Sequence, residues 1–177
     1  ELGLRFSNAS YSPHCVADFA VMMILMSIRK MKTIMKRVEN NDYSLPGLQG
    51  KEMHNLTIGV IGTGRIGQVT ARNLSGFGVK IIGYDVYEND SIKDVLEYVS
   101  LDKLLKEADV ITLHAPLFES TQHIINEENL QKTKKGVVIV NCARGELIDT
   151  SALIKYIDNG HIGAVGLDVL EGELGIF

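Results

Sequence analysis

The chain has 177 residues, a length that fits one domain with a real hydrophobic core. Its residues are 45% hydrophobic and 23% charged, close to the globular average, which excludes disorder as the main state. With 18 Lys and Arg against 22 Asp and Glu, the formal net charge is −4, and without a basic block the chain is a poor nucleic-acid binder.

The first predicted element is one long helix. Apolar residues recur at helical spacing over residues 16–38, and Ser12-Pro13 ahead of them suits an N-cap followed by proline in the first turn. Residues 19–26 form an unbroken apolar run, which is far shorter than the ~20 residues that span a bilayer. Because this run is apolar on every side, a helix here must be covered on several faces. The pattern leaves two readings open: a central core helix, or a helix shared with a second subunit.

The rest of the chain alternates between predicted strands and helices. Residues 40–55 are polar, contain Pro46, Gly47 and Gly50, and predict a connecting loop. Short apolar runs then predict strands at 57–62, 79–84, 109–113, 136–140 and 162–167, with a short one near 98–99. Helical patterns lie between them at 66–74, 101–108, 127–133 and 151–158, and Asn159-Gly160 stops the last. This alternation predicts an α/β fold with a doubly wound parallel sheet.

A glycine-rich loop joins the first of these strands to the helix that follows. Residues 62–67 read GTGRIG, which is GxGxxG, and Asp85 ends the next strand at close to the ~20-residue spacing of a Rossmann-type dinucleotide site. In such a site Gly62 permits the tight turn, Gly64 lets the pyrophosphate approach the backbone, and Gly67 lets the helix pack on the sheet. The sequence therefore predicts a dinucleotide-binding domain.

The same loop predicts which cofactor is preferred. The free N–H groups of Arg65, Ile66 and Gly67 are expected to face the phosphates, and the Arg65 guanidinium either adds a contact or is a solvated surface group. Asp85 is expected to accept hydrogen bonds from the adenosine ribose and to repel a 2′-phosphate, which favours NAD over NADP. The alternative for Asp85 is a structural acid at a strand end.

Cysteines and histidines give little support for a metal site. Cys15 and Cys142 form no CxxC pair, so neither a metal nor a disulfide framework is expected, and a reducing, cytoplasmic compartment is the default. His14, His54, His123 and His161 show no metal-ligand spacing and are interpreted as surface residues. The chain begins at Glu1, which indicates a piece of a longer protein.

Three further motifs follow predicted strands: HAPL at 114–117, NCARG at 141–145 and DVLEGE at 168–173. With Tyr11-Ser12-Pro13 and the ending EGELGIF, they make the chain resemble the D-2-hydroxyacid dehydrogenases, most of all the D-lactate dehydrogenase-like branch. The resemblance implies an NAD-binding domain at 51–177, a helical segment at 1–50 for interdomain or dimer contact, and a flanking substrate domain missing from this chain. It also implies a homodimer, and of the two interpretations of the first helix it favours the helix shared with a second subunit.

The resemblance implies roles for individual residues. Arg144 would bind and polarise a small 2-oxo acid with its planar fork, and Glu173 would hydrogen-bond the catalytic histidine and raise its pKa. That histidine lies beyond Phe177 in the family, and none of the five present fits its place.

The remaining implied roles concern the walls of the site. His114 and Pro116 would line the cofactor pocket, and Asp168 would receive the nicotinamide carboxamide. Cys142 is a pocket-wall position or a buried inert thiol, and Tyr11 reaches the substrate cleft or caps the long helix. Glu171 is interpreted as an exposed acid.

The implied activity is reversible hydride transfer between NADH and a small 2-oxo acid, with pyruvate and D-lactate as the first choice. The alternatives are an (R)-2-hydroxyisocaproate-type dehydrogenase with a bulkier substrate, or an NAD-sensing, corepressor-like binding protein. A chain that ends at Phe177 is expected to bind NAD without turnover.

Overall fold

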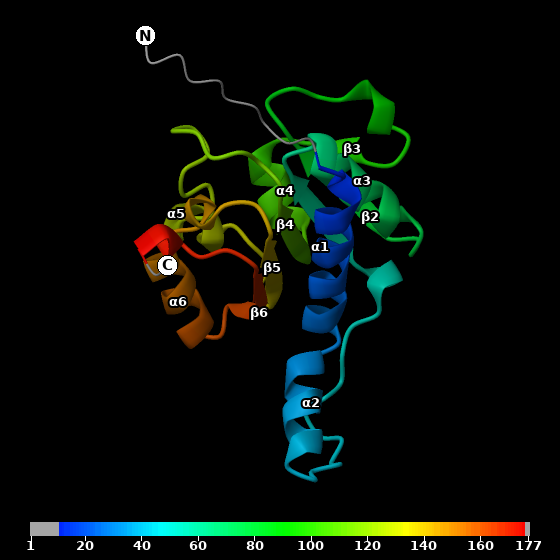
Figure 1. Ribbon diagram of the computed structural model, residues 1–177, viewed down its shortest axis with the longest axis vertical. Coiled ribbons are helices and arrows are strands. Elements are labelled where there is room, and N and C mark those ends of the chain that lie inside the picture. The colour runs from blue at the N-terminus through cyan, green and yellow to red at the C-terminus, as the bar shows by residue number, and fades with distance from the viewer. Residues whose placement is uncertain (1–10, 176–177) are drawn as a thin grey trace, which may run out of the picture.

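A six-stranded parallel sheet forms the centre of the molecule (Figure 1). The computed structural model describes residues 11–175. The strand order is β3-β2-β1-β4-β5-β6, and every neighbouring pair is parallel. The strands are β1 (Thr57–Ile61), β2 (Lys80–Tyr84), β3 (Glu97–Tyr98), β4 (Val110–Leu113), β5 (Val137–Asn141) and β6 (Ile162–Leu167). This order is that of the doubly wound Rossmann fold, as the sequence predicted.

Helices cover both faces of the sheet. One face carries α1 (Pro13–Ile28) and α3 (Arg65–Ser75), and the other carries α4 (Leu101–Glu107), α5 (Glu127–Gln131) and α6 (Thr150–Asp158). A further helix, α2 (Met31–Glu39), follows α1. Short 3₁₀ turns lie at Met53–Asn55, Asp90–Ile92, Gly145–Leu147 and Glu173–Gly175.

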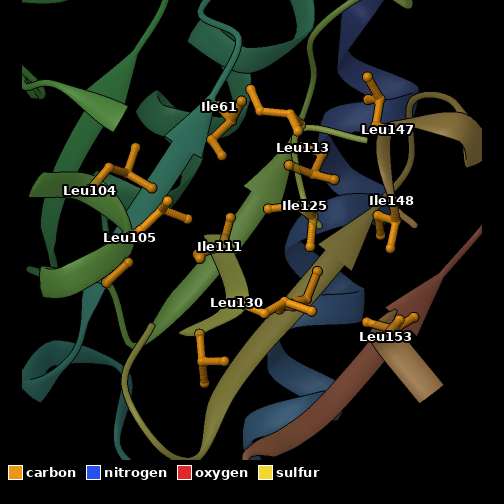
Figure 2. Packing of buried hydrophobic residues seen from close by; sticks show 14 of the residues in the cluster. Ile61, Leu104, Leu105, Ile111, Leu113, Ile125, Leu130, Leu147, Ile148 and Leu153 are labelled. Carbon is orange, nitrogen blue, oxygen red and sulfur yellow. The ribbon is translucent and has the colours of Figure 1, made fainter. Parts of the chain in front are cut away.

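Alternate residues of each central strand supply the two cores. In β4, Ile111 and Leu113 pack under α4, α5 and α6 (Figure 2), whereas Val110 packs on the side of α1 and α3. Both sets are buried because a parallel sheet is covered on both faces. For that reason the strands read as unbroken apolar runs, and all six strand predictions are confirmed to within two residues at each end.

The prediction of one long helix over residues 16–38 is wrong. The helix ends at Ile28, Arg29 is its C-cap, and Lys30 adopts a left-handed backbone with φ of 55° before α2 begins. The returning loop explains the break: Lys51 N–H donates to the Ile28 carbonyl at 3.0 Å, and Lys30 Nζ donates to the Gly47 carbonyl at 2.8 Å. The predicted cap is confirmed, because the Ser12 side chain accepts from His14 N–H and Pro13 opens the helix.

One stripe of α1 is buried, and the rest of that helix is partly or fully exposed. Ala17, Ala20, Ile24 and Ile28 pack on the sheet and α3, while Phe19 and Met22 are 38% and 41% exposed. No residue of α2 is buried, and Figure 1 shows it extending away from the sheet. Within residues 11–175, no helix has both the length and the apolar character needed to cross a membrane.

Candidate active site

The predicted site residues gather at the carboxyl edge of the sheet. The strand order reverses between β1 and β4, which lie side by side and both end at this edge. In doubly wound sheets the crevice at such a switch point binds ligands. The glycine loop follows β1, Asp85 follows β2, His114 follows β4, Arg144 follows β5, and Asp168 follows β6.

The three glycines of the loop meet three different environments. Gly62 has φ of 89°, and a Cβ there would strike the backbone of His114 and Ala115. A Cβ on Gly67 would overlap the Gly62 carbonyl, so the start of α3 lies directly on the loop. A Cβ on Gly64 would meet nothing within 4 Å, which leaves open space at the position expected to face a pyrophosphate.

The N-terminus of α3 is arranged to receive an anion. Gly64 is its N-cap and provides no side-chain hydrogen bond, so the first N–H groups, including those of Arg65 and Ile66, carry no side-chain cap. Free N–H groups and the helix dipole favour phosphate at such an end. Arg65 is exposed, and its Nη2 donates to the Tyr11 carbonyl at 3.1 Å, which places Tyr11, 63% exposed, beside the loop.

Asp85 lies beside the glycine loop, as its spacing predicted. Its Oδ2 accepts the Thr63 backbone N–H at 2.6 Å and the Thr63 hydroxyl at 3.1 Å, and its Oδ1 accepts Tyr87 N–H at 3.2 Å. The carboxylate is half-buried at the end of β2. This geometry supports a role at the ribose.

His114 is a neutral imidazole packed against the glycine loop. Its Nε2 lies 3.0 Å from the Thr112 hydroxyl, and its buried Nδ1 has no hydrogen-bond partner among residues 11–175. Part of the residue is accessible, but Nδ1 is enclosed, and burial lowers the pKa of His114 to about 4. At neutral pH this histidine is therefore the uncharged imidazole and not the imidazolium that a general acid would need. Pro116, two residues on, is exposed, and its carbonyl accepts the Thr121 hydroxyl at 2.7 Å.

His114 should make the cofactor-free protein sensitive to acid. The unfolded state binds a proton near pH 6.5 and the folded state only near pH 4, so the stabilising effect of the neutral ring is complete above pH 6.5 and is lost as the pH falls toward 4. Between pH 7 and pH 5 this effect should lower the free energy of unfolding of the parent by about 2 kcal/mol. His114→Gln, which has no titrating ring, should lack this part of the decrease. Urea unfolding of both proteins at the two pH values measures this difference. Equal losses in parent and variant would contradict it.

Asn141 holds the loop that presents Arg144. Its fully buried side chain donates to the Arg144 carbonyl at 2.7 Å and accepts Ala143 N–H at 3.0 Å. The Arg144 side chain is exposed, and its Nη1 donates to the Ala143 carbonyl at 2.6 Å. A fixed backbone with an exposed guanidinium suits recognition of a carboxylate.

Cys142 and Asp168 lie together beside this loop. Asp168 N–H donates to the Asn141 carbonyl at 3.0 Å, and the Asp168 side chain is exposed. Burial, helped by the Asp168 charge, raises the pKa of Cys142 to about 12. Cys142 is therefore a protonated thiol at neutral pH, which favours its reading as an inert wall residue over any chemical role.

The segment that carries Glu173 packs on the Arg144 loop. A Cβ on Gly145 would overlap the backbone of Leu170 and Glu171, so the two segments touch directly. Glu173 is half-buried, and its Oε2 accepts Leu170 N–H at 2.9 Å. Arg144 and Glu173 are thus carried by adjoining segments.

The interpretation of Glu171 as an exposed acid is wrong, because it is half-buried in an ion pair with His123, a partly exposed surface histidine. His123 Nε2 lies 2.5 Å from Glu171 Oε1, both side chains are about one-third exposed, and Glu171 Oε2 accepts Thr150 N–H at 3.1 Å. These bonds to His123 and Thr150 hold the pKa of Glu171 below its usual value. His161 is also half-buried, since its Nε2 lies 2.9 Å from the Thr133 hydroxyl, whereas His14 and His54 are exposed.

Sequence reasoning missed three supports of the site: Thr63, Tyr98 and Asn141. Thr63 and Asn141 stand inside motifs that were recognised, at positions where a buried polar side chain needs partners. Tyr98 carried no signal, because its contact with Thr63 arises only from strand pairing. In residues 11–175 no group of three or more His, Cys, Asp or Glu side chains could hold a metal ion.

Comparison with known proteins identifies the class. The fold, the glycine loop and Asp85 define a dinucleotide-binding domain, and the family model described as D-isomer specific 2-hydroxyacid dehydrogenase, NAD binding domain, matches residues 21–174. The chain belongs to this family of NAD-dependent oxidoreductases.

Individual relatives agree with that assignment. An aromatic 2-oxoacid reductase of Clostridium sporogenes is 49% identical over 179 residues, which cover 100% of this chain and 54% of that protein. The solved pyruvate reductase of Chlamydomonas reinhardtii has a TM-score of 0.94 at 46% identity, covering 99% of this chain and 52% of that one. The D-lactate dehydrogenase of Aquifex aeolicus, solved with NAD and lactic acid, has a TM-score of 0.91 at 42% identity, over 94% of this chain and 51% of that one. The chain thus spans about half the length of the curated relatives it matches.

The residues present fit the cofactor that this family binds. Gly64 leaves room, the start of α3 offers free N–H groups, Asp85 lies at the end of β2, and the buried Nδ1 of His114 lacks a partner within the described residues. The first three features are those that a dinucleotide site needs at these positions, and the unpartnered Nδ1 of His114 leaves a polar atom that a ligand could satisfy.

Proposed function

We propose that the full-length protein containing this chain reduces a small 2-oxo acid with NADH, with pyruvate and D-lactate as the physiological pair. The observation that carries the proposal is the direct packing of the Arg144 loop on the segment with Glu173, at the carboxyl edge beside the glycine loop. The proposed division of the chain is an NAD-binding domain at 51–177 and a helix with a connecting segment at 1–50, of which residues 1–10 and 176–177 lie outside the described part.

The residues of the chain would divide the work of the reaction. NADH supplies the hydride to the carbonyl carbon, and a proton reaches the carbonyl oxygen from an acid. Arg144 would orient the substrate carboxylate and stabilise the charge that develops on that oxygen. Asp85 would hold the ribose, Asp168 the carboxamide, and Tyr11, Pro116 and Cys142 would contribute to the walls.

Glu173 would position the acid that supplies this proton. Neither His114 nor His123 suits that role, since His114 is neutral at pH 7 and His123 is engaged by Glu171. A histidine supplied from outside residues 11–175 would donate a ring N–H to the Glu173 carboxylate, and that negative charge would raise the pKa of the histidine so that it keeps its proton.

A substrate panel on the full-length protein tests the proposal. Pyruvate, 2-oxoisocaproate and phenylpyruvate are compared by kcat/KM with NADH, and the hand of the product is determined. Pyruvate should be preferred and should give D-lactate. The aromatic 2-oxoacid reductase among the relatives favours a bulkier substrate as the second candidate, and a higher kcat/KM for phenylpyruvate would select it. Binding of NAD without turnover of any 2-oxo acid would instead indicate a binding protein.

We propose a second copy of the chain as the partner of the exposed α1–α2 face. A groove of about 750 Å³ on this face is lined mainly by apolar side chains, including Met22, Leu25, Met31 and Phe77. Methionine-rich surfaces adapt well to a partner. The resemblance of this segment to the family's dimer contact supports the same choice.

The full-length protein should sediment as a dimer, and Met22→Lys should shift it toward monomer, because a charge would be buried in the apolar contact. Ile157→Lys is the matched control, because Ile157 is also an exposed apolar residue but lies on α6, and this variant should leave the dimer intact. A parent protein that sediments as a monomer at all concentrations would refute the assignment.

A further inference from the structure

We propose that Tyr98 is a positioning residue that fixes the Asp85 carboxylate through Thr63 and thereby sharpens the choice of NAD over NADP. The inference rests on the proposed role of Asp85 at the ribose and goes beyond it, because it assigns cofactor discrimination to a residue outside the fingerprint loop.

Tyr98 reaches the glycine loop from the edge of the sheet. It ends β3, which pairs with β2 in the register Gly83 to Tyr98, and Asp85 follows Gly83 by two residues. The Tyr98 hydroxyl lies 2.8 Å from Thr63 Oγ1, which in turn lies 3.1 Å from Asp85 Oδ2. Thr63 is only 2% exposed, so water cannot readily replace either partner.

The direction of every hydrogen bond in this chain of contacts is determined. A carboxylate has lone pairs only, so the Thr63 hydroxyl donates its single proton to Asp85. Thr63 must then accept its hydrogen bond from the Tyr98 hydroxyl. The Tyr98 oxygen accepts the Asn89 backbone N–H at 2.8 Å, so the single tyrosine proton is the one donated to Thr63. The sequence of donors runs from Asn89 through Tyr98 and Thr63 to Asp85, and such chains strengthen their members.

This series of hydrogen bonds leaves the Asp85 carboxylate little freedom to rotate. Oδ2 already accepts two hydrogen bonds from Thr63, and Oδ1 accepts one from Tyr87 N–H, so one lone pair of Oδ1 remains for a ribose hydroxyl. A 2′-phosphate would meet a negative charge that cannot turn away without breaking the bonds to Thr63. Discrimination against NADP therefore depends on the fixed position of Asp85 as well as on its charge.

Loss of the Tyr98 hydroxyl would remove both of its hydrogen bonds, the one to Thr63 and the one from Asn89. The Thr63 hydroxyl would lose its donor and become free to rotate, and Asn89 N–H would lose its acceptor in the segment that follows Asp85. One neutral hydrogen bond contributes about 0.5–1.5 kcal/mol, a factor of roughly 2 to 10 in an equilibrium constant. We expect Tyr98→Phe to weaken NAD binding by about threefold to tenfold and to weaken NADP binding less.

Titration calorimetry of the full-length protein with NAD and with NADP tests the inference. The preference for NAD should narrow in Tyr98→Phe and in Thr63→Val, and Thr63→Ser, which keeps the hydroxyl, should retain the parent's preference. Tyr156→Phe is the matched control, because it removes a buried tyrosine hydroxyl whose contact, with the Glu127 carbonyl at 3.5 Å, lies on the far side of the molecule.

An unchanged preference in Tyr98→Phe and Thr63→Val would overturn the role of Tyr98. The proposed role of Asp85 fails separately, if Asp85→Asn prefers NAD over NADP as strongly as the parent does. Thermal unfolding of Tyr98→Phe beside Tyr156→Phe identifies a loss of fold, and in that event the Thr63→Val and Thr63→Ser pair decides the question.

Discussion

Arg144→Lys in the full-length enzyme should lower kcat/KM for the 2-oxo acid by roughly 100- to 1000-fold, the range seen when one donor to a developing oxyanion is lost. Lysine keeps the positive charge but not the planar fork that can hold a carboxylate and a carbonyl oxygen together. The loop itself should not move, because Asn141 holds it through the Arg144 backbone carbonyl rather than through the guanidinium.

Steady-state kinetics and a separate NAD titration distinguish this effect from a damaged fold. Affinity for NAD should stay within about twofold of the parent, since the lost contacts are to substrate. Arg72→Lys, on the exposed side of α3 and outside the α1–α2 groove, is the matched control and should be as active as the parent. A near-normal rate for Arg144→Lys would remove Arg144 from the reaction.

Gly64→Ala and Gly67→Ala should separate cofactor binding from folding. A methyl group on Gly64 meets nothing within 4 Å in the free protein, but it would occupy the space expected for the pyrophosphate, so NAD affinity should fall by at least about tenfold with little change in stability. A methyl group on Gly67 overlaps the Gly62 carbonyl, so the loop must shift, at a cost of about 1–3 kcal/mol in the free energy of unfolding as well as the loss of NAD binding.

Denaturant unfolding without cofactor, followed by NAD titration, measures both effects in the same samples. Gly78→Ala is a control for the added methyl, because it also meets nothing within 4 Å, although its φ of 66° introduces some strain. If Gly64→Ala binds NAD as tightly as the parent, the pyrophosphate does not lie against this loop.

The strands and the positions of most candidate site residues were predictable from the sequence because their causes are local. Continuous apolar runs mark strands covered on both faces, and the three glycines, Asp85 and Arg144 follow strand ends whose positions those runs determine. In a parallel sheet all these strand ends meet at one edge, so local patterns sufficed to bring them together.

The features that escaped prediction depend on residues distant in sequence. The break at Lys30 depends on Lys51 and Gly47, which return to cap the end of α1. His123 and Glu171 meet across 48 positions of the chain, and Tyr98 and Thr63 meet across 35. Periodicity reports which face of an element is apolar, but it does not report which distant loop satisfies its polar groups.

The helix α2 has a consequence for how the protein should behave on dilution. A nine-residue helix is too short to persist on its own in water, and none of its residues is buried in this chain. Its backbone amides should therefore exchange with solvent deuterium far faster than those of α1, and they should slow as protein concentration rises if another surface covers them. The exchange rate of the α2 amides would then measure how much of the protein is assembled, while the exchange rates of the sheet amides should not depend on concentration.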